Sequence, residues 1–133
     1  TVITIMHAQC LGDLRTEAIH DQSGTKMLTD APRDNLGKGE AFSPTDLLAT
    51  SLASCIVTTM GIKARALNVD MKGTKCSVEK IMQASPRMVA EVKVNLTWGP
   101  LVPEEAKAAL REAGLACPVT LCLDPKVKKT IHC

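Results

Sequence analysis

Aromatic side chains are almost absent from this chain of 133 residues, which has one Phe, one Trp and no Tyr. Proteins that bind single-stranded nucleic acids stack the bases on aromatic rings, and Phe42 and Trp98 are too few for such a platform. A one-sided charge is lacking too, since 16 Lys and Arg against 14 Asp and Glu leave a net charge of +2. A dedicated nucleic-acid binder is far more basic. Apolar residues make up 45% of the chain, so the sequence indicates a folded protein of one domain, residues 1–133, rather than a disordered one.

A secretory leader and a metal-ligand pattern are also missing. The first ten residues have no basic stretch followed by a long apolar run, so we expect a cytoplasmic protein with reduced thiols. No closely spaced cysteine pair is matched by a second pair, as zinc sites require, and the ends around Cys122, His132 and Cys133 fit no ligand spacing either. We therefore expect neither a metal nor a bound cofactor. The six cysteines are Cys10, Cys55, Cys76, Cys117, Cys122 and Cys133.

The N-terminal part favours three short strands, over Val2–Ala8, Leu14–His20 and Thr25–Thr29. Gly and Asp residues at 11–13 and 21–24 are typical of the turns between them. A meander of three short strands has too little core to be stable alone. We therefore expect residues 1–29 to pack on something later in the chain or on another chain.

A helix start is the clearest local signal. Ser43 is a good N-cap, Pro44 suits the first helical position and Asp46 stands where a capping box needs a side-chain acceptor. Residues 47–62 carry no charge, and the helix is expected to continue to about Leu67. Because sixteen uncharged residues are fewer than the roughly 20 that cross a bilayer, we predict a central helix buried nearly all round.

The second half of the chain predicts a hairpin, two short helices and a last strand. Residues 88–98 alternate between apolar and polar side chains, which is typical of a half-buried strand, and its partner is expected within residues 69–84. A helix is expected from 103 to about 114, a shorter one from Pro118, and a strand over 126–133. The fold class is therefore α+β, in the order βββ-α-ββ-α-α-β with antiparallel sheets around the central helix.

Two of the cysteines have special positions. Cys55 lies in the middle of the uncharged helix, where a thiol is most often a small packing residue. Cys117 directly precedes Pro118 and is expected at a helix N-cap, where amide groups stabilise a thiolate. From the residues alone, the role of Cys55 can be either core packing or redox chemistry.

These features together resemble the OsmC/Ohr family of thiol-dependent hydroperoxide reductases. The matching motifs are Ser43-Pro44-Thr45-Asp46-Leu47-Leu48, then Ala53-Ser54-Cys55, then Cys117-Pro118-Val119. The resemblance implies that Cys55 attacks the peroxide and becomes a sulfenic acid, and that Cys117 resolves it to a disulfide. An external dithiol, lipoyl or small, would reduce that disulfide. The resemblance also implies an intertwined homodimer, with residues 1–29 exchanged onto the partner subunit and residues 30–133 forming the body.

One departure concerns the cation that activates the thiol. Ohr-type members carry a Glu after the helix Pro that holds an activating Arg, whereas this chain has Thr45 there. Arg33 is the candidate catalytic cation, Arg15 is a second one, and Glu40 could orient either. For Arg33 a solvated loop charge is the competing interpretation. The alternative function is a non-catalytic OsmC-like stress protein that binds a small apolar ligand in the dimer-interface pocket.

Overall fold

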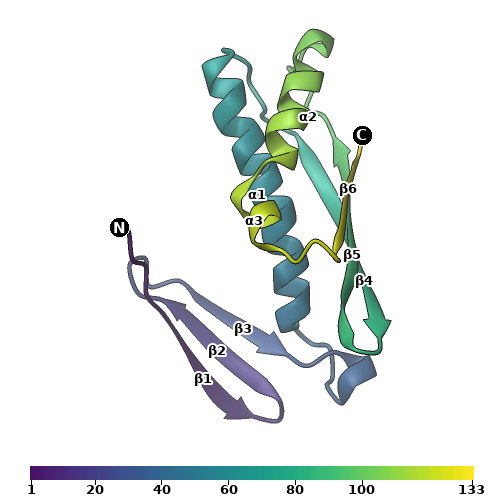
Figure 1. The fold of residues 1–133 in the computed structure, drawn as a ribbon. Coiled ribbons are helices and arrows are strands. Elements are labelled where there is room, and N and C mark those ends of the chain that lie inside the picture. The colour runs from purple at the N-terminus through teal and green to yellow at the C-terminus, as the bar shows by residue number, and fades with distance from the viewer. The chain divides into compact units, whose positions relative to one another are not determined.

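The computed structural model describes residues 1–133, which form two compact units, residues 1–47 and residues 48–133 (Figure 1). The element order is the predicted βββ-α-ββ-α-α-β, with two added short 3-10 turns, η1 (Arg33–Asn35) and η2 (Glu104–Ala106). The α+β class is therefore confirmed.

The first unit holds an antiparallel sheet of three strands in the order β1-β2-β3. The strands are β1 (Met6–Gly12), β2 (Arg15–His20) and β3 (Lys26–Asp30). Strand β1 begins later and ends later than predicted, because the turn to β2 lies at residues 12–14 rather than 11–13. There Gly12, Asp13 and Leu14 all have positive φ, at 86°, 52° and 62°. Leu seldom adopts that conformation, so its side chain gave no signal for this turn.

All the buried residues of the first unit are polar. Its buried residues are Thr29, Asp30 and Ser43, and ten of its large apolar side chains are exposed. The unit thus has no hydrophobic core of its own, as expected for a small meander. The exposed apolar residues are Val2, Ile3, Ile5, Met6, Leu11, Leu14, Met27, Leu28, Leu36 and Phe42.

Helix α1 (Pro44–Ala66) starts with the predicted capping box. The amide of Ser43 donates to Asp46 Oδ2 at 2.9 Å, and the amide of Asp46 donates to Ser43 Oγ at 3.1 Å. Two amides that the helix cannot satisfy itself therefore find partners, which fixes the start of the helix at this point.

The prediction that α1 is buried nearly all round is wrong for the single chain. Its buried residues recur every three or four positions and so form one face, whereas Ile62 is 69% exposed. The exposed face of α1 carries no charge between residues 47 and 62, so the sequence pattern did not distinguish it from a buried face. By length and composition α1 could also cross a membrane, but core helices pass the same test. The buried residues of α1 are Ala49, Leu52, Ala53, Ile56, Met60 and Ala64.

The second unit contains a mixed sheet in the order β4-β5-β6. Strands β4 (Lys75–Ala84) and β5 (Arg87–Thr97) form the predicted antiparallel hairpin. Strand β6 (Lys128–His132) runs parallel to β5, so the prediction of purely antiparallel sheets is wrong here. A parallel neighbour requires a long crossover, and the two helices between β5 and β6 supply it.

A bulge in the hairpin explains why buried and less buried residues do not alternate strictly along β5. Residue pairing shifts between Ile81 and Met82, so that Ile81 lies opposite Glu91 but Met82 lies opposite Val89. One extra residue on β5 reverses which side chains face inward. Val89 is therefore buried on one side of the bulge, whereas Val92 and Val94 are buried on the other.

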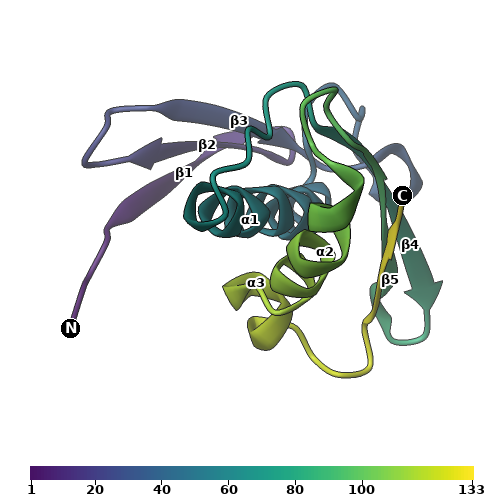
Figure 2. The ribbon, with the colours of Figure 1, turned by 90° about the horizontal axis from the view of Figure 1, so that it is seen from above.

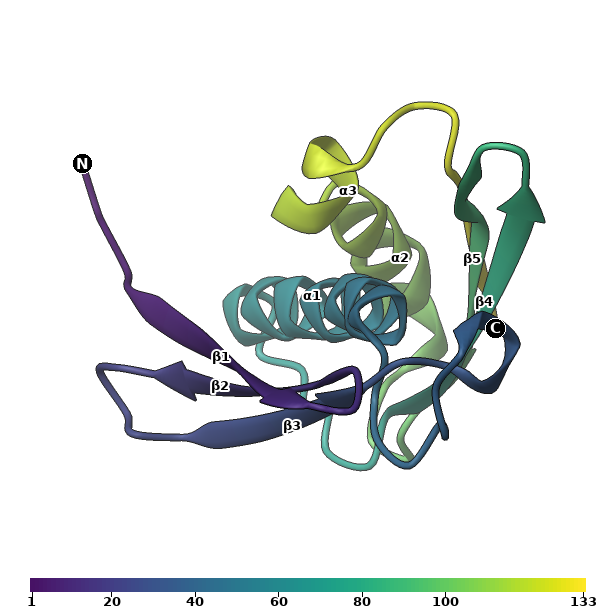
Figure 3. The same ribbon diagram turned by 90° about the horizontal axis from the view of Figure 1, so that it is seen from below.

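Helices α2 (Lys107–Leu115) and α3 (Pro118–Cys122) lie with α1 on the same side of the second sheet (Figures 2 and 3). Every buried apolar residue of the chain belongs to this unit. Gly114 was expected to end α2, but the helix continues to Leu115 and Gly114 is buried. A Cβ at Gly114 would lie 2.8 Å from Met60 Cε and 3.0 Å from Ile56 Cγ2, so glycine lets α2 approach α1 closely.

Candidate redox site

Cys55 lies in the middle of α1, half-buried against the core of the second unit. Its Sγ is 4.0 Å from Thr59 Oγ1, one turn further along the helix. The side chains at 52, 53 and 56 are buried and belong to the inward face of α1, while Ser54 and Thr58 are exposed. Cys55 therefore stands at the edge of the buried face.

Cys117 occupies the predicted N-cap of α3. Its backbone is extended (φ −68°, ψ 155°), and Pro118 takes the first helical position. Its side chain is 0% exposed, and its Sγ lies 3.2 Å from Thr120 Oγ1. The local sequence explains this arrangement, because an X-Pro peptide favours an extended residue just before a helix.

Cys55 packs against the core cluster that contains Cys117, and its side chain is near enough to affect the pKa of Cys117. Burial raises the pKa of the Cys117 thiol, but hydrogen bonds donated by the Thr120 side chain and amide, by the Cys55 thiol and by the Val119 amide outweigh it. The net effect lowers the pKa of Cys117.

The two candidate cations have different surroundings within the first unit. Arg33 lies in η1, is exposed, and donates from Nε to the Lys38 carbonyl at 3.2 Å. Arg15, at the start of β2, is 3.0 Å from Glu40 Oε1 and 3.6 Å from Asp30 Oδ2 through Nη2. The hydrogen bond and charge of Glu40 raise the pKa of Arg15. Glu40, which could have oriented either arginine, therefore holds Arg15.

Asp30 is a polar residue that no sequence motif singles out. It is 1% exposed, and its Oδ2 accepts a hydrogen bond from the Glu40 amide at 3.0 Å. Its Oδ1 is buried and has no hydrogen-bond partner. An unpaired buried carboxylate oxygen is costly, so a hydrogen-bond donor from outside the chain is expected to satisfy it. Asp30 and Glu40 together supply Arg15 with carboxylates although Thr45 stands in place of the family Glu.

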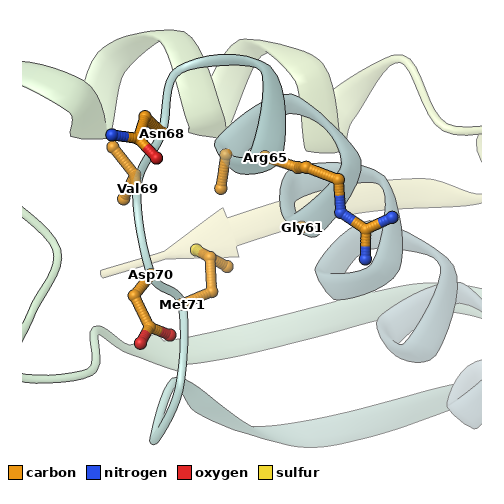
Figure 4. A pocket seen from close by; sticks show the side chains of 7 residues that line it. Gly61, Arg65, Asn68, Val69, Asp70 and Met71 are labelled. Carbon is orange, nitrogen blue, oxygen red and sulfur yellow. The ribbon is translucent and has the colours of Figure 1, made fainter.

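A separate pocket of about 380 Å³ lies at the C-terminal end of α1 (Figure 4). Its charged lining residues are Arg65 and Asp70, and the Arg65 side chain points away from Asp70. Neither Cys55 nor Cys117 lines this pocket. The four remaining cysteines are also outside the candidate pair: Cys10, Cys122 and Cys133 are exposed, and burial raises the pKa of the half-buried Cys76.

Comparison with known proteins identifies the class to which this fold and this cysteine pair belong. The profile of the family described as OsmC-like protein matches residues 37–132. A structure from Psychrobacter arcticus, provisionally described as an osmotic stress induced and detoxification response protein, is 45% identical to this chain. It superposes with a TM-score of 0.93 over 99% of this chain and 96% of its own. The chain belongs to the OsmC-like family.

More distant structures share the fold. An organic hydroperoxide resistance protein OsmC from Legionella pneumophila has 21% identity and a TM-score of 0.75, covering 99% of this chain and 98% of its own. The organic hydroperoxide resistance protein OhrB of Bacillus subtilis has 16% identity and a TM-score of 0.66, covering 98% and 97%. No curated protein matches the sequence significantly. The OsmC-like fold predicted from the motifs is thus confirmed across nearly the whole chain.

Proposed function

We propose that this protein is a thiol-dependent hydroperoxide reductase in which Cys55 and Cys117 form the redox pair. The observation that carries the proposal is the proximity of the two side chains in one core cluster, one in α1 and the other at the N-cap of α3. Membership of a family with named hydroperoxide resistance proteins supports the same reaction. No metal or cofactor is needed, because sulfur supplies the electrons.

The exposure of the two sulfurs supports assigning the first step to Cys55. Cys117 is 0% exposed, so a peroxide cannot reach it, whereas Cys55 is half-buried at the edge of its helix face. Cys55 reacts as its thiolate, because the thiolate is the nucleophilic form of cysteine. Cys55 then attacks one peroxide oxygen, the O–O bond breaks, and the alcohol leaves after protonation. Cys55 becomes a sulfenic acid.

Cys117 is proposed as the resolving thiol. Its sulfur attacks the sulfenic sulfur of Cys55, a disulfide forms and the hydroxide leaves as water. An external dithiol, lipoyl or small, then reduces the disulfide in two exchange steps and becomes a disulfide itself. Because the two side chains are already near each other in the reduced protein, we expect resolution to be faster than further oxidation of Cys55.

A guanidinium from the first unit is proposed to favour the thiolate, as a nearby cation does at other reactive cysteines. Arg33 and Arg15 are the two candidates. The surroundings favour Arg15, which Glu40 and Asp30 hold, over Arg33, whose one hydrogen bond goes to its own loop. An arginine with fixed carboxylate partners is the better oriented donor.

We further propose a homodimer in which residues 1–29 pack on the partner subunit. The support is the first unit itself, which exposes ten large apolar residues and buries no apolar one. Apolar surface of that extent in a small soluble unit marks an interaction face. Light scattering after gel filtration tests this, and a monomer at micromolar concentration would contradict it.

The decisive experiment measures consumption of cumene hydroperoxide and hydrogen peroxide with dithiothreitol or dihydrolipoamide. We expect turnover to vanish in Cys55→Ser, and Cys117→Ser to accumulate over-oxidised Cys55 that mass spectrometry detects. Cys76→Ser, which removes a half-buried thiol from β4, is the matched control and should retain turnover. Turnover no faster than with dithiol alone, and equal in all variants, would overturn the proposal and favour a non-catalytic protein that binds a small apolar ligand.

A further inference from the structure

Gly61 lies in the interior of α1, where no neighbouring group requires a glycine. A Cβ at Gly61 would meet nothing within 4 Å, whereas a Cβ at Gly114 would collide with Met60. Glycine weakens a helix interior relative to alanine, because its backbone loses more freedom on folding. Gly61 also lines the pocket of about 380 Å³ at the end of α1 (Figure 4). The missing side chain therefore leaves space open at this pocket.

The pocket combines an apolar wall with a few polar groups. Ala64 of α1 is 1% exposed, and Val69 and Met71 pack against the core of the second unit. The volume lies within the range of small-molecule sites, roughly 300–1,000 Å³, which have apolar linings and few polar groups. The polar side chains that line this pocket are those of Arg65, Asn68 and Asp70.

The fold does not use up these polar side chains. The turn after α1 satisfies its own backbone, since the Asn68 amide donates to the Arg65 carbonyl at 3.2 Å. Neither the Arg65 guanidinium nor the Asn68 side-chain amide has a hydrogen-bond or ion-pair partner in the chain. Asp70 accepts the Lys72 amide at 2.8 Å with Oδ1 only. Donors and an acceptor are thus available to a ligand at the pocket.

Arg65 and Asp70 give the pocket one positive and one negative charge. They form no ion pair with each other, and their side chains lead in different directions, from α1 and from the loop after it (Figure 4). Because the two charges cancel, neither a simple anion nor a simple cation matches the lining, whereas a ligand with two separated charges does. A free amino acid carries both charges on one carbon. A dipeptide separates them by a peptide unit.

We propose that this pocket binds dipeptides with apolar side chains. The terminal carboxylate of the dipeptide pairs with the Arg65 guanidinium, and its terminal ammonium pairs with Asp70 Oδ2. The Asn68 side chain binds the peptide group, and the apolar side chains lie on Val69 and Met71. The site is separate from the proposed peroxidase reaction, since no cysteine lines the pocket.

The test titrates leucyl-leucine into the full chain at up to millimolar concentration and follows the backbone amides by heteronuclear NMR. We expect saturable shifts at Gly61, Asn68 and Val69. Two blocked probes remove one charge each: the N-acetylated dipeptide lacks the ammonium, and the dipeptide amide lacks the carboxylate. Both should bind several-fold more weakly than leucyl-leucine, as should free leucine. Blocked probes that bind as tightly as leucyl-leucine would refute the pairing of two charges.

Three variants locate the site. Gly61→Leu fills the open space and should abolish binding, and Arg65→Gln should weaken leucyl-leucine several-fold but leave the dipeptide amide unchanged. Lys63→Gln removes a cation from the same last helical turn outside the pocket and should bind as wild type does. Circular dichroism checks that each variant folds. Absence of saturable shifts, or unchanged affinity in Gly61→Leu, would refute the proposal. Cys55→Ser should bind the dipeptide normally, so the result is independent of peroxidase turnover.

Discussion

Gly114 of α2 lies so close to Met60 of α1 that a Cβ at position 114 would be 2.8 Å from Met60 Cε. Met60 is 0% exposed and cannot move its side chain into solvent. This contact sets the distance between the two helices that carry Cys55 and lead into Cys117. A larger residue at position 114 would force Met60 to move or the two helices to separate.

Gly114→Ala should therefore destabilise the protein. Overpacking of a full core costs about 1–3 kcal/mol, and the better helix propensity of Ala returns only about 1 kcal/mol. We expect a net loss of about 1 kcal/mol in the free energy of unfolding, measured by urea denaturation. Gly61→Ala is the matched control, since a Cβ at Gly61 in α1 would meet nothing within 4 Å. A stabilised Gly114→Ala variant would contradict the close approach.

Thr120→Val should raise the pKa of Cys117, because the Thr120 hydroxyl is a donor that favours its thiolate. Since the folded pKa of Cys117 is lowered, its contribution to stability is present above the ordinary thiol pKa. That contribution is lost as the pH falls through the lowered folded value. The stability difference between wild type and Thr120→Val should therefore shrink as the pH falls across that window. Urea denaturation of the reduced proteins at several pH values measures it, and a difference independent of pH would contradict the assignment.

Ser43→Ala should weaken the start of α1. It removes the oxygen that accepts the Asp46 amide at 3.1 Å, and loss of an N-cap costs about 1 kcal/mol. Ser54→Ala, an exposed change in the same helix, should leave the free energy of unfolding within about 0.5 kcal/mol of wild type. Equal stabilities for the two variants would show that the capping box does not hold the helix start.

Arg15→Gln should lower kcat/KM for cumene hydroperoxide by about tenfold, which is what one pKa unit of thiolate population supplies at neutral pH. Arg33→Gln is the matched charge removal and should stay within about threefold of wild type, since one exposed charge is worth under 1 kcal/mol. The pH at which kcat/KM rises should be higher than in the wild type for Arg15→Gln but not for Arg33→Gln. The reverse order of effects would transfer the role to Arg33.

Glu40→Gln should separate orientation from charge. It keeps an acceptor for Arg15 but removes the carboxylate that lies 3.0 Å from Nη2. We expect a smaller loss of kcat/KM than in Arg15→Gln, with the affinity for peroxide unchanged. No loss at all would indicate that Asp30 alone holds the guanidinium.

Local signals predicted the parts of the fold that depend on local chemistry. The capping box at Ser43 and Asp46 and the N-cap position of Cys117 before Pro118 were both readable from the sequence. The bulge opposite Ile81 and the positive φ of Leu14 were not, because neither requires a special residue type. The parallel alignment of β6 depends on where the crossover helices lead, which no pattern within the strand records.

The residues of the candidate site likewise include some that motifs predict and some that depend on tertiary structure. The motifs pointed to Cys55 and Cys117, but not to Thr120, whose hydroxyl becomes relevant only once α3 turns it toward Cys117. Arg33 had the more suitable position in the sequence, yet Glu40 contacts Arg15. Ion pairs between a strand and a loop depend on tertiary structure, so composition and spacing cannot rank the two arginines.

The absence of buried apolar residues from residues 1–47 has a consequence for biosynthesis. These residues are synthesised before residues 48–133, yet every buried apolar residue lies after position 48. The early part of the nascent chain therefore has nothing to collapse upon, and its apolar strands stay open to chaperones and to neighbouring chains. Ribosome pausing just after residue 47 would lengthen the most aggregation-prone interval of synthesis, whereas a pause near the end of β6 would do little harm.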